Sequence, residues 1–279
     1  MAAVEPWAFH PHPEVWVLMV AIIVAYWYLV RRGPVSRKQV AQFGAGWLIL
    51  WFGADYPIHD IGEKYLFSVH MFQHLLFSLV APGLLLLGVP DWLQRKLWGS
   101  GWQAAVLKRL GRPIFAGFLY TAWLAFSHWP ALVDTALRSE PVHFWMHLML
   151  FSTAALMWFP VLNRNPDLPM LTPPARMLYV FLQSIMPTVP ASFFTFADGV
   201  IYKTYANAPR PFNISAIADQ QLAAAIMKVW GGLLLWLIIA TMFFRWTAAD
   251  ERERRARRRV LTWDEVQAEL DRTDAPTVG

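Results

Sequence analysis

The chain has 279 residues, of which 57% are hydrophobic and 15% are charged, and it contains no cysteine. A soluble domain carries about 25% charged residues, so this composition excludes an ordinary soluble protein. The lack of cysteine excludes disulfides, thiolate metal sites and thiol catalysis. The net charge of +5 comes from basic residues that gather in particular loops. This pattern indicates membrane topology and no nucleic-acid partner.

Seven apolar segments along the chain are about as long as a bilayer-spanning helix. They lie at about residues 14–30, 40–56, 65–88, 113–132, 141–162, 174–197 and 219–245. In the second segment Gly44, Gly46 and Gly53 predict close helix packing. In the sixth, Pro187 and Pro190 predict a kink. The segments predict an all-α, polytopic membrane protein with seven transmembrane helices.

Basic residues follow the first, third, fifth and seventh segments, whereas the loops after the second and fourth carry more acidic than basic residues. Because basic loops stay in the cytoplasm, we expect the N-terminus outside and the C-terminus in the cytoplasm. We expect residues 1–245 to form a transmembrane domain surrounded by membrane lipid. Residues 246–279, which include an arginine-rich run from Glu251 to Arg259, are expected to form a basic cytoplasmic tail with a short polar helix.

Two of the apolar segments carry a pair of histidines spaced four residues apart. His70 and His74 lie in HMFQH of the third segment, and His143 and His147 lie in HFWMH of the fifth. On a helix this spacing puts both imidazoles of a pair on one face, about one turn apart. Ionisable groups within a membrane span are costly and commonly mark function. Under the predicted topology all eight histidines fall in the outer half of the molecule.

Imidazoles without thiolates suit copper, zinc or haem iron. If the third and fifth helices face each other, the two pairs supply up to four nitrogen ligands. The paired histidines are therefore our leading candidates for a metal site. Thioethers favour Cu(I), but Met71 and Met146 point about 100° away from the histidine face. We therefore attribute both methionines to packing.

A second group of candidate metal ligands lies near the same outer surface. His59 and Asp60 lie in the loop before the third segment, and His128 lies near the outer end of the fourth. Asp219 opens the seventh segment, where it could join the site or cap its own helix.

Three motifs occur in the order and spacing of a known membrane family. They are HMFQHLLFSLVAPGLLLLG from His70, HFWMH from His143, and DQQLAAAIMKVWGG from Asp219. Over about residues 46–241 the chain resembles the CtaG-type multi-span membrane proteins, which are assembly factors for cytochrome c oxidase linked to copper delivery. The resemblance implies a seven-span fold in a bacterial inner membrane and a role in making the copper centre of the oxidase core subunit.

The leading hypothesis is a non-enzymatic assembly factor. It receives copper from a periplasmic donor, holds it stably or transiently on the histidines, and passes it to the oxidase core subunit. The alternative is a membrane redox protein that ligates haem with one histidine from the third segment and one from the fifth. A third hypothesis is a transporter with Lys228 and Asp219 along its path. The ionisable groups gather at one side, and no internal repeat is evident, which argues against a transporter.

Overall fold

The computed structural model describes residues 5–257 and 263–273, and over these residues the chain forms helices and no strand. The chain divides into two compact units, Met1–Ile239 and Ala240–Gly279. A polar helix, α16 (Trp263–Thr273), occurs in the second unit. The last part of the arginine-rich run, residues 258–259, lies outside the described residues. The predicted end of the transmembrane domain at residue 245 stays a prediction, since compactness does not report which residues lie in lipid.

Five helical stretches are long and apolar enough to cross a membrane: Pro13–Val30, Phe67–Gly88, Glu140–Leu162, Pro173–Phe196 and Ala216–Ala256. They comprise α1 (Pro13–Val30), α4 (Phe67–Leu75), η1 (Leu76–Val80), α5 (Ala81–Gly88), α10 (Glu140–Leu162), α11 (Pro173–Ile185), α12 (Thr188–Phe196), α14 (Ala216–Ala225), η2 (Ile226–Trp230) and α15 (Gly231–Arg257). The predicted all-helical membrane protein is thereby confirmed.

Two of the seven predicted crossings do not reach that standard of length and hydropathy. The apolar helix α8 (Pro113–Ser127) has only 15 residues. The helix α2 (Arg37–Ala54) has 18 residues but begins with Arg37, Lys38 and Gln39. A count of seven crossings therefore stays a prediction. The shorter helices are α3 (Ile58–Lys64), α6 (Asp91–Trp98), α7 (Gly101–Leu110), α9 (Pro130–Ala136) and α13 (Lys203–Ala206).

Prolines set several helix boundaries. The fourth segment is predicted to reach residue 132, but α8 ends at Ser127 and α9 begins at Pro130. Trp129 is extended because the residue before a proline is disfavoured in the α conformation. This break leaves His128 at the end of α8. The predicted kink in the sixth segment is confirmed, since α11 ends at Ile185 and α12 begins after Pro187.

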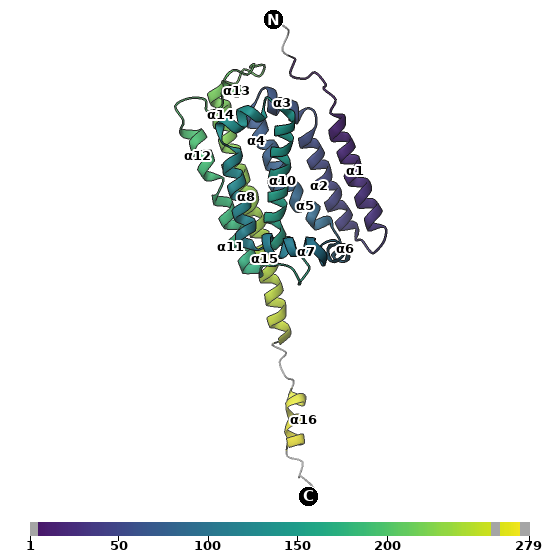
Figure 1. Cartoon of the computed structure of the whole chain (residues 1–279). Helices are drawn as coiled ribbons and strands as arrows, with labels where there is room; N and C mark the ends of the chain where they lie inside the picture. The colour runs from purple at the N-terminus through teal and green to yellow at the C-terminus, as the bar shows by residue number, and fades with distance from the viewer. Residues whose placement is uncertain (1–4, 258–262, 274–279) are drawn as a thin grey trace. The chain divides into compact units, whose positions relative to one another are not determined.

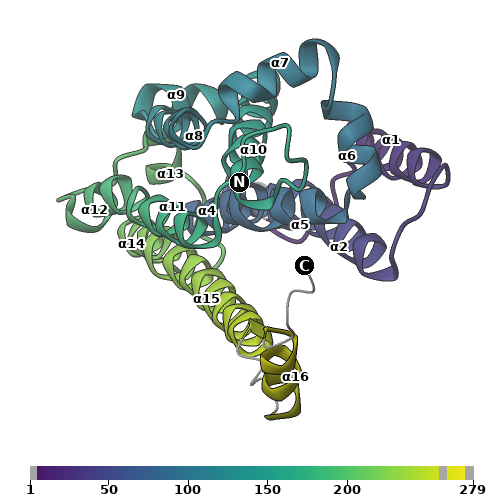
Figure 2. The ribbon, with the colours of Figure 1, turned by 90° about the horizontal axis from the view of Figure 1, so that it is seen from below.

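Within the first unit α10 packs against α8, α5 and η1, while α14 packs against α4 and α12, and α2 packs along α5. Figure 1 shows α3 and α13 at one end of this bundle and α6 and α7 at the other. Figure 2 shows α10 surrounded by the other helices of the unit. The histidine-bearing α4 and α10 thus lie in the interior of the bundle.

Small residues allow α2 to approach the third segment closely, as predicted. A Cβ on Gly46 would lie 3.0 Å from the backbone nitrogen of Leu85, and one on Gly53 would lie 2.8 Å from the ring of Phe77. The prediction is wrong for Gly44, where a Cβ would meet nothing within 4 Å. Gly44 lies on the other side of α2, about 200° around the helix from Gly46.

Two spans contain a π-helical turn, η1 directly after α4 and η2 directly after α14. Such turns insert an extra residue into a helix and occur frequently at functional sites. The extra residue in η1 changes the side-chain register below His74. The histidine face of α4 and the α2-packing face of α5 can therefore belong to one continuous span.

Candidate metal site

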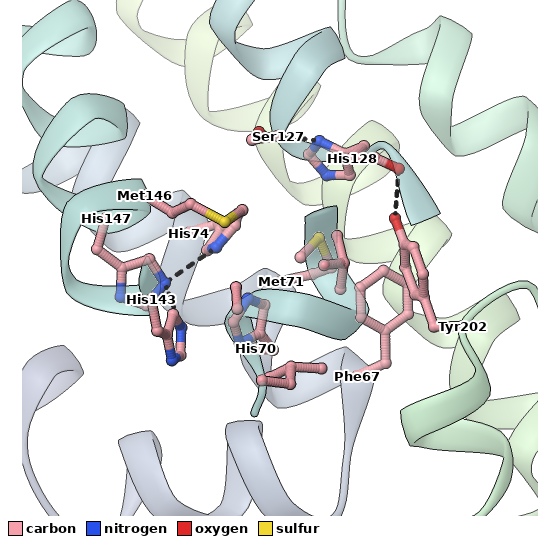
Figure 3. A pocket seen from close by; sticks show the side chains of 13 residues that line it. Phe67, His70, Met71, His74, Ser127, His128, His143, Met146, His147 and Tyr202 are labelled. Carbon is pink, nitrogen blue, oxygen red and sulfur yellow. Dashed lines mark hydrogen bonds between the residues drawn. The ribbon is translucent and has the colours of Figure 1, made fainter. Parts of the chain in front are cut away.

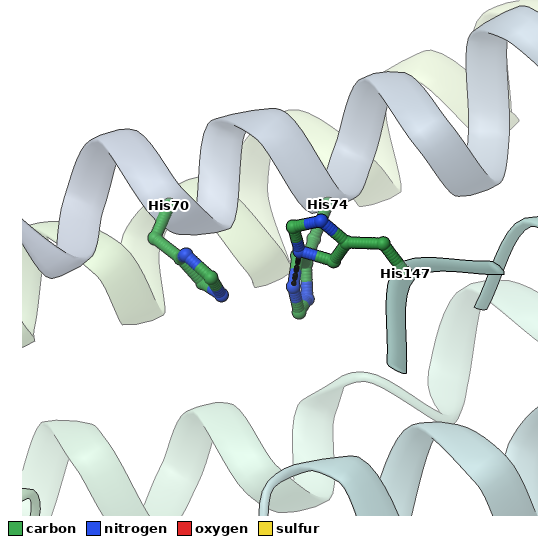
Figure 4. Close-up of side chains that lie close together, drawn as sticks. All are labelled: His70, His74 and His147. Atoms are coloured by element: carbon green, nitrogen blue, oxygen red, sulfur yellow. Dashed lines mark hydrogen bonds between the residues drawn. The ribbon is translucent and has the colours of Figure 1, made fainter. Parts of the chain in front are cut away.

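Three imidazole nitrogens meet between α4 and α10. Nε2 of His147 lies 3.1 Å from Nε2 of His74 and 3.1 Å from Nε2 of His143. The ring of His70 is 4.4 Å from that of His74 and 5.5 Å from that of His147, between centroids. One nitrogen from each of His70, His74 and His147 lies within 4.8 Å of the others, and Figure 4 shows these rings bordering one space. The structure thus brings together all four paired histidines.

The protons available on neutral rings cannot form hydrogen bonds across both short nitrogen–nitrogen contacts of His147. A neutral imidazole carries a proton on one nitrogen and a lone pair on the other. In its neutral form His143 would hold its proton on Nδ1, which contacts the carboxylate of Glu63, so its Nε2 would present a lone pair to His147. The single proton of His147 can serve only one neighbour. His70 Nδ1 and His74 Nδ1 are also buried without a hydrogen-bond partner among the described residues.

The nitrogen separations suit one small cation. Two nitrogens bound at about 2.0 Å to the same ion lie about 3.3–4 Å apart, depending on geometry. A shift of a few tenths of an ångström from 3.1 Å would reach that range. Buried lone pairs that face one another are costly in the protein alone, and a bound cation would satisfy them together.

Glu63 of α3 supports the cluster from outside. Its carboxylate accepts from Nδ1 of His143 and lies 3.0 Å from Nε2 of His59. Burial alone would raise the pKa of Glu63, but the hydrogen bonds from the two histidines outweigh burial and hold the pKa well below its usual value. A carboxylate on the far nitrogen fixes the tautomer and orientation of a metal-binding histidine. Glu63 was not predicted, and its only signal was its position four residues after His59.

His59 lies between Glu63 and the N-terminal segment. Its ring is 5.6 Å from that of His143 and 5.1 Å from that of His12, and its Nδ1 is 3.1 Å from Nε2 of Gln73. Burial disfavours a charge on His59, yet its bond to Glu63 raises the pKa above the ordinary 6.5. His59 therefore contacts the cluster's outer support and does not reach its centre.

Asp60 faces away from the cluster. Its carboxylate lies 3.0 Å from Nε2 of His12 and 3.3 Å from Nδ1 of His10, and it also accepts from Lys64. Burial alone would raise the pKa of Asp60, but the hydrogen bonds from His12 and Lys64 outweigh burial and lower it. The structure places Asp60 with the N-terminal segment, at the surface end of a chain of contacts that leads through His59 and Glu63.

Asp219 caps a helix, but not its own. Its oxygens accept from the N–H of Phe67 at 2.8 Å, and from the N–H and hydroxyl of Ser68 at 3.0 and 2.6 Å. These groups begin α4, whereas α14 is capped by Ser215. Arg210 adds a nearby cation, with Nη1 3.7 Å from Oδ2 of Asp219. Because both oxygens are engaged, the structure does not bring Asp219 into the imidazole cluster.

His128 lies across a small cavity from the cluster. Its ring centroid is 6.1 Å from that of His74. The cavity volume is about 10 Å³, which is space for about one water or ion. Met71 and Met146 line it together with the histidines, as Figure 3 shows. The prediction that these methionines only pack is incomplete, because the cavity reaches around α4 beyond its histidine face.

Uncharacterized mycobacterial proteins resemble this chain. Those of Mycobacterium bovis and Mycobacterium tuberculosis are each 25% identical to it over 92% of this chain and 40% of their own length. One from Mycobacterium leprae is 23% identical over 82% of this chain and 37% of its own length. The chain thus spans about two fifths of the length of these relatives. No solved structure matches it.

The comparison with protein families agrees with the resemblance of the three motifs. Residues 20–249 match the family described as cytochrome c oxidase caa3 assembly factor, Caa3_CtaG. The match includes all the helices that carry the imidazole cluster and extends on both sides of residues 46–241. The chain belongs to the cytochrome c oxidase caa3 assembly factor family.

Proposed function

We propose that this chain takes up copper at the outer side of a bacterial inner membrane and hands it to the cytochrome c oxidase core subunit, without itself being an enzyme. Membership of the family supports a role in oxidase assembly. The observation that carries the copper assignment is the convergence of His74 and His143 on His147, at 3.1 Å each. Copper is here the cargo of the protein.

The donor set favours copper over the alternatives. Imidazoles bind several transition metals, but thioethers favour Cu(I), and both donor types border the cavity. A haem would need an iron and a wide planar ring between its two axial histidines. The 3.1 Å between His74 and His147 and a cavity for about one ion leave no such space. These dimensions argue for a single ion rather than haem.

A series of neighbouring polar side chains gives an incoming ion a way to the cluster. It begins at His10, whose side chain is 50% exposed, and includes His12 and Asp60. It continues through His59 and Glu63 to His143. We propose that a periplasmic copper donor docks at this end, because its cargo would then enter beside groups that bind cations.

The proposed orientation places α3 and α13 outside and α6 and α7 in the cytoplasm, with α2 and α8 completing seven crossings. The last turns of α6 and α7 carry Arg95, Lys96, Lys108 and Arg109, as expected for a cytoplasmic face. The transporter hypothesis loses support, because Lys228 is exposed on the outside of η2 rather than directed into a path.

The test is the copper content of the purified full chain. Wild type loaded with Cu(I) and washed should retain copper, and His74→Ala/His147→Ala should retain much less, because at most two imidazoles of the cluster remain. The matched control is Phe72→Leu/Phe144→Leu, on the same two helices but at exposed side chains. Equal copper in wild type and the histidine variant would overturn the proposal, as would a haem absorption band in the wild type.

A further inference from the structure

The wall of the cavity opposite the imidazole cluster contains a polar atom without a partner. The side chain of His128 is buried, with 8% exposed, and its Nε2 makes no hydrogen bond with the described residues. Burying such an atom costs free energy unless something binds it. The cavity lies beside it, so a ligand in the cavity is the available partner.

The tautomer of His128 is fixed by its surroundings. Nδ1 lies 2.6 Å from the carbonyl oxygen of Leu124, and a carbonyl only accepts, so Nδ1 carries the proton. The neutral ring must then present a lone pair at Nε2. Tyr202 steadies the backbone here, since its hydroxyl donates to the carbonyl of His128 at 3.0 Å. This is the arrangement of a histidine prepared to bind a metal: one nitrogen is anchored and the other is free.

Two thioethers border the same space. Met71 and Met146 are 3% and 7% exposed, and both line the cavity with His128. Figure 3 shows their side chains reaching into the region between the imidazole cluster and His128. A site with one imidazole and two thioethers is softer than the cluster of imidazoles, and it prefers Cu(I).

We propose that His128, Met71 and Met146 form a second Cu(I) subsite, to which an ion moves from the imidazole cluster on its way out of the protein. This inference rests on the proposed function. The transfer is a ligand exchange without a change of oxidation state. The bond from Cu(I) to Nε2 of His147 breaks as a bond to a thioether sulfur forms. His74, which borders both groups of ligands, stays near the ion throughout.

A second cavity continues the path. Its volume is about 40 Å³. Met71, His74 and His128 line this cavity as well as the first one. Its other side includes Met227 of η2 and Pro187 at the break between α11 and α12. The softer subsite therefore lies between the imidazole cluster and a wider space that carries a third thioether, which gives the transfer a direction.

The first experiment measures release of copper. The full chain in nanodiscs is loaded with one equivalent of Cu(I), and release to bathocuproine disulfonate is followed by absorbance. Met71→Leu/Met146→Leu keeps the packing volume and should retain one copper. It should release the copper about tenfold more slowly, which corresponds to a barrier about 1.4 kcal/mol higher, because no thioether replaces His147 during the exchange. Met19→Leu/Met157→Leu, at buried methionines outside both cavities, should release copper at the wild-type rate.

The second experiment asks which atoms bind copper when the cluster is incomplete. His147→Ala should still bind Cu(I), and X-ray absorption should report copper–sulfur bonds that disappear when Met71→Leu/Met146→Leu is added. An absence of sulfur ligands in His147→Ala, or wild-type release from the methionine variant, would overturn the second subsite alone. Failure of wild type to bind copper at all would overturn the proposed function and the subsite together.

Discussion

Helix α4 begins at a buried carboxylate and continues into a buried cluster of imidazoles. These two regions differ in whether the protein itself supplies hydrogen-bond partners for the buried polar atoms. Asp219 meets two backbone N–H groups, a hydroxyl and a nearby guanidinium. In the cluster, His147 meets two other imidazole nitrogens. The carboxylate is complete within the protein, whereas the imidazoles leave lone pairs to a cation. Polar residues buried around α4 thus divide into those that hold the fold and those that await a ligand.

The largest expected effect comes from removing the Asp219 carboxylate, whose hydrogen-bond partners all lie within the protein. Asp219→Ala leaves the first N–H groups of α4 buried without a partner, so we expect a loss of about 3 kcal/mol or more in the free energy of unfolding. Thermal unfolding of the protein in detergent measures this loss. Asp219→Asn keeps one acceptor oxygen, so its unfolding temperature should lie between those of wild type and Asp219→Ala. Unfolding of Asp219→Ala at the wild-type temperature would contradict the capping role.

In the imidazole region the expected effect is on copper and not on the fold. Glu63→Gln removes the charge that anchors Nδ1 of His143, and we expect Cu(I) affinity to fall about 10–100-fold. Competition with a chelator of known affinity measures it. Glu140→Gln, at an exposed carboxylate on α10, is the control and should bind as wild type does. If Glu63→Gln binds copper with undiminished affinity, Glu63 is not a positioning residue for the cluster.

The sequence predicted the imidazole region better than the carboxylate region. The i, i+4 spacing of His70 with His74, and of His143 with His147, fixes which face of each helix is polar. Two polar faces within one apolar bundle have few alternatives to meeting each other. Local patterns of this kind are preserved when helices pack, so the facing pairs could be predicted without knowing the fold.

Contacts between distant parts of the chain could not be predicted in this way. Asp219 stands at the start of an apolar segment, where local rules predict a cap for its own helix, but Ser215 already fills that position. Its actual partners lie 151 and 152 residues earlier. Met71 and Met146 were attributed to packing because, on a helical wheel, they point away from the face that carries the histidines. The cavity instead extends around α4 to His128, and only the packing of α8 reveals this.

The smallest expected effect concerns Asp60, a carboxylate that is complete like Asp219 but lies at the surface end of the polar chain. Its hydrogen bonds from His12 and Lys64 lower its pKa in the folded protein, so the unfolded chain binds more protons, and stability rises with pH. The contribution of Asp60 is therefore present above the unfolded pKa of about 3.9 and is lost as pH falls through the folded value.

Between pH 5 and pH 3 the free energy of unfolding should fall more steeply in wild type than in Asp60→Asn. The expected difference is below about 1 kcal/mol, because Lys64 is half-exposed and solvent screens its charge. Unfolding in detergent at stepped pH measures both slopes. Equal slopes would mean that the partners of Asp60 do not hold its charge. The carboxylate would then be free to bind an incoming cation, and Asp60 would belong with the imidazoles rather than with Asp219.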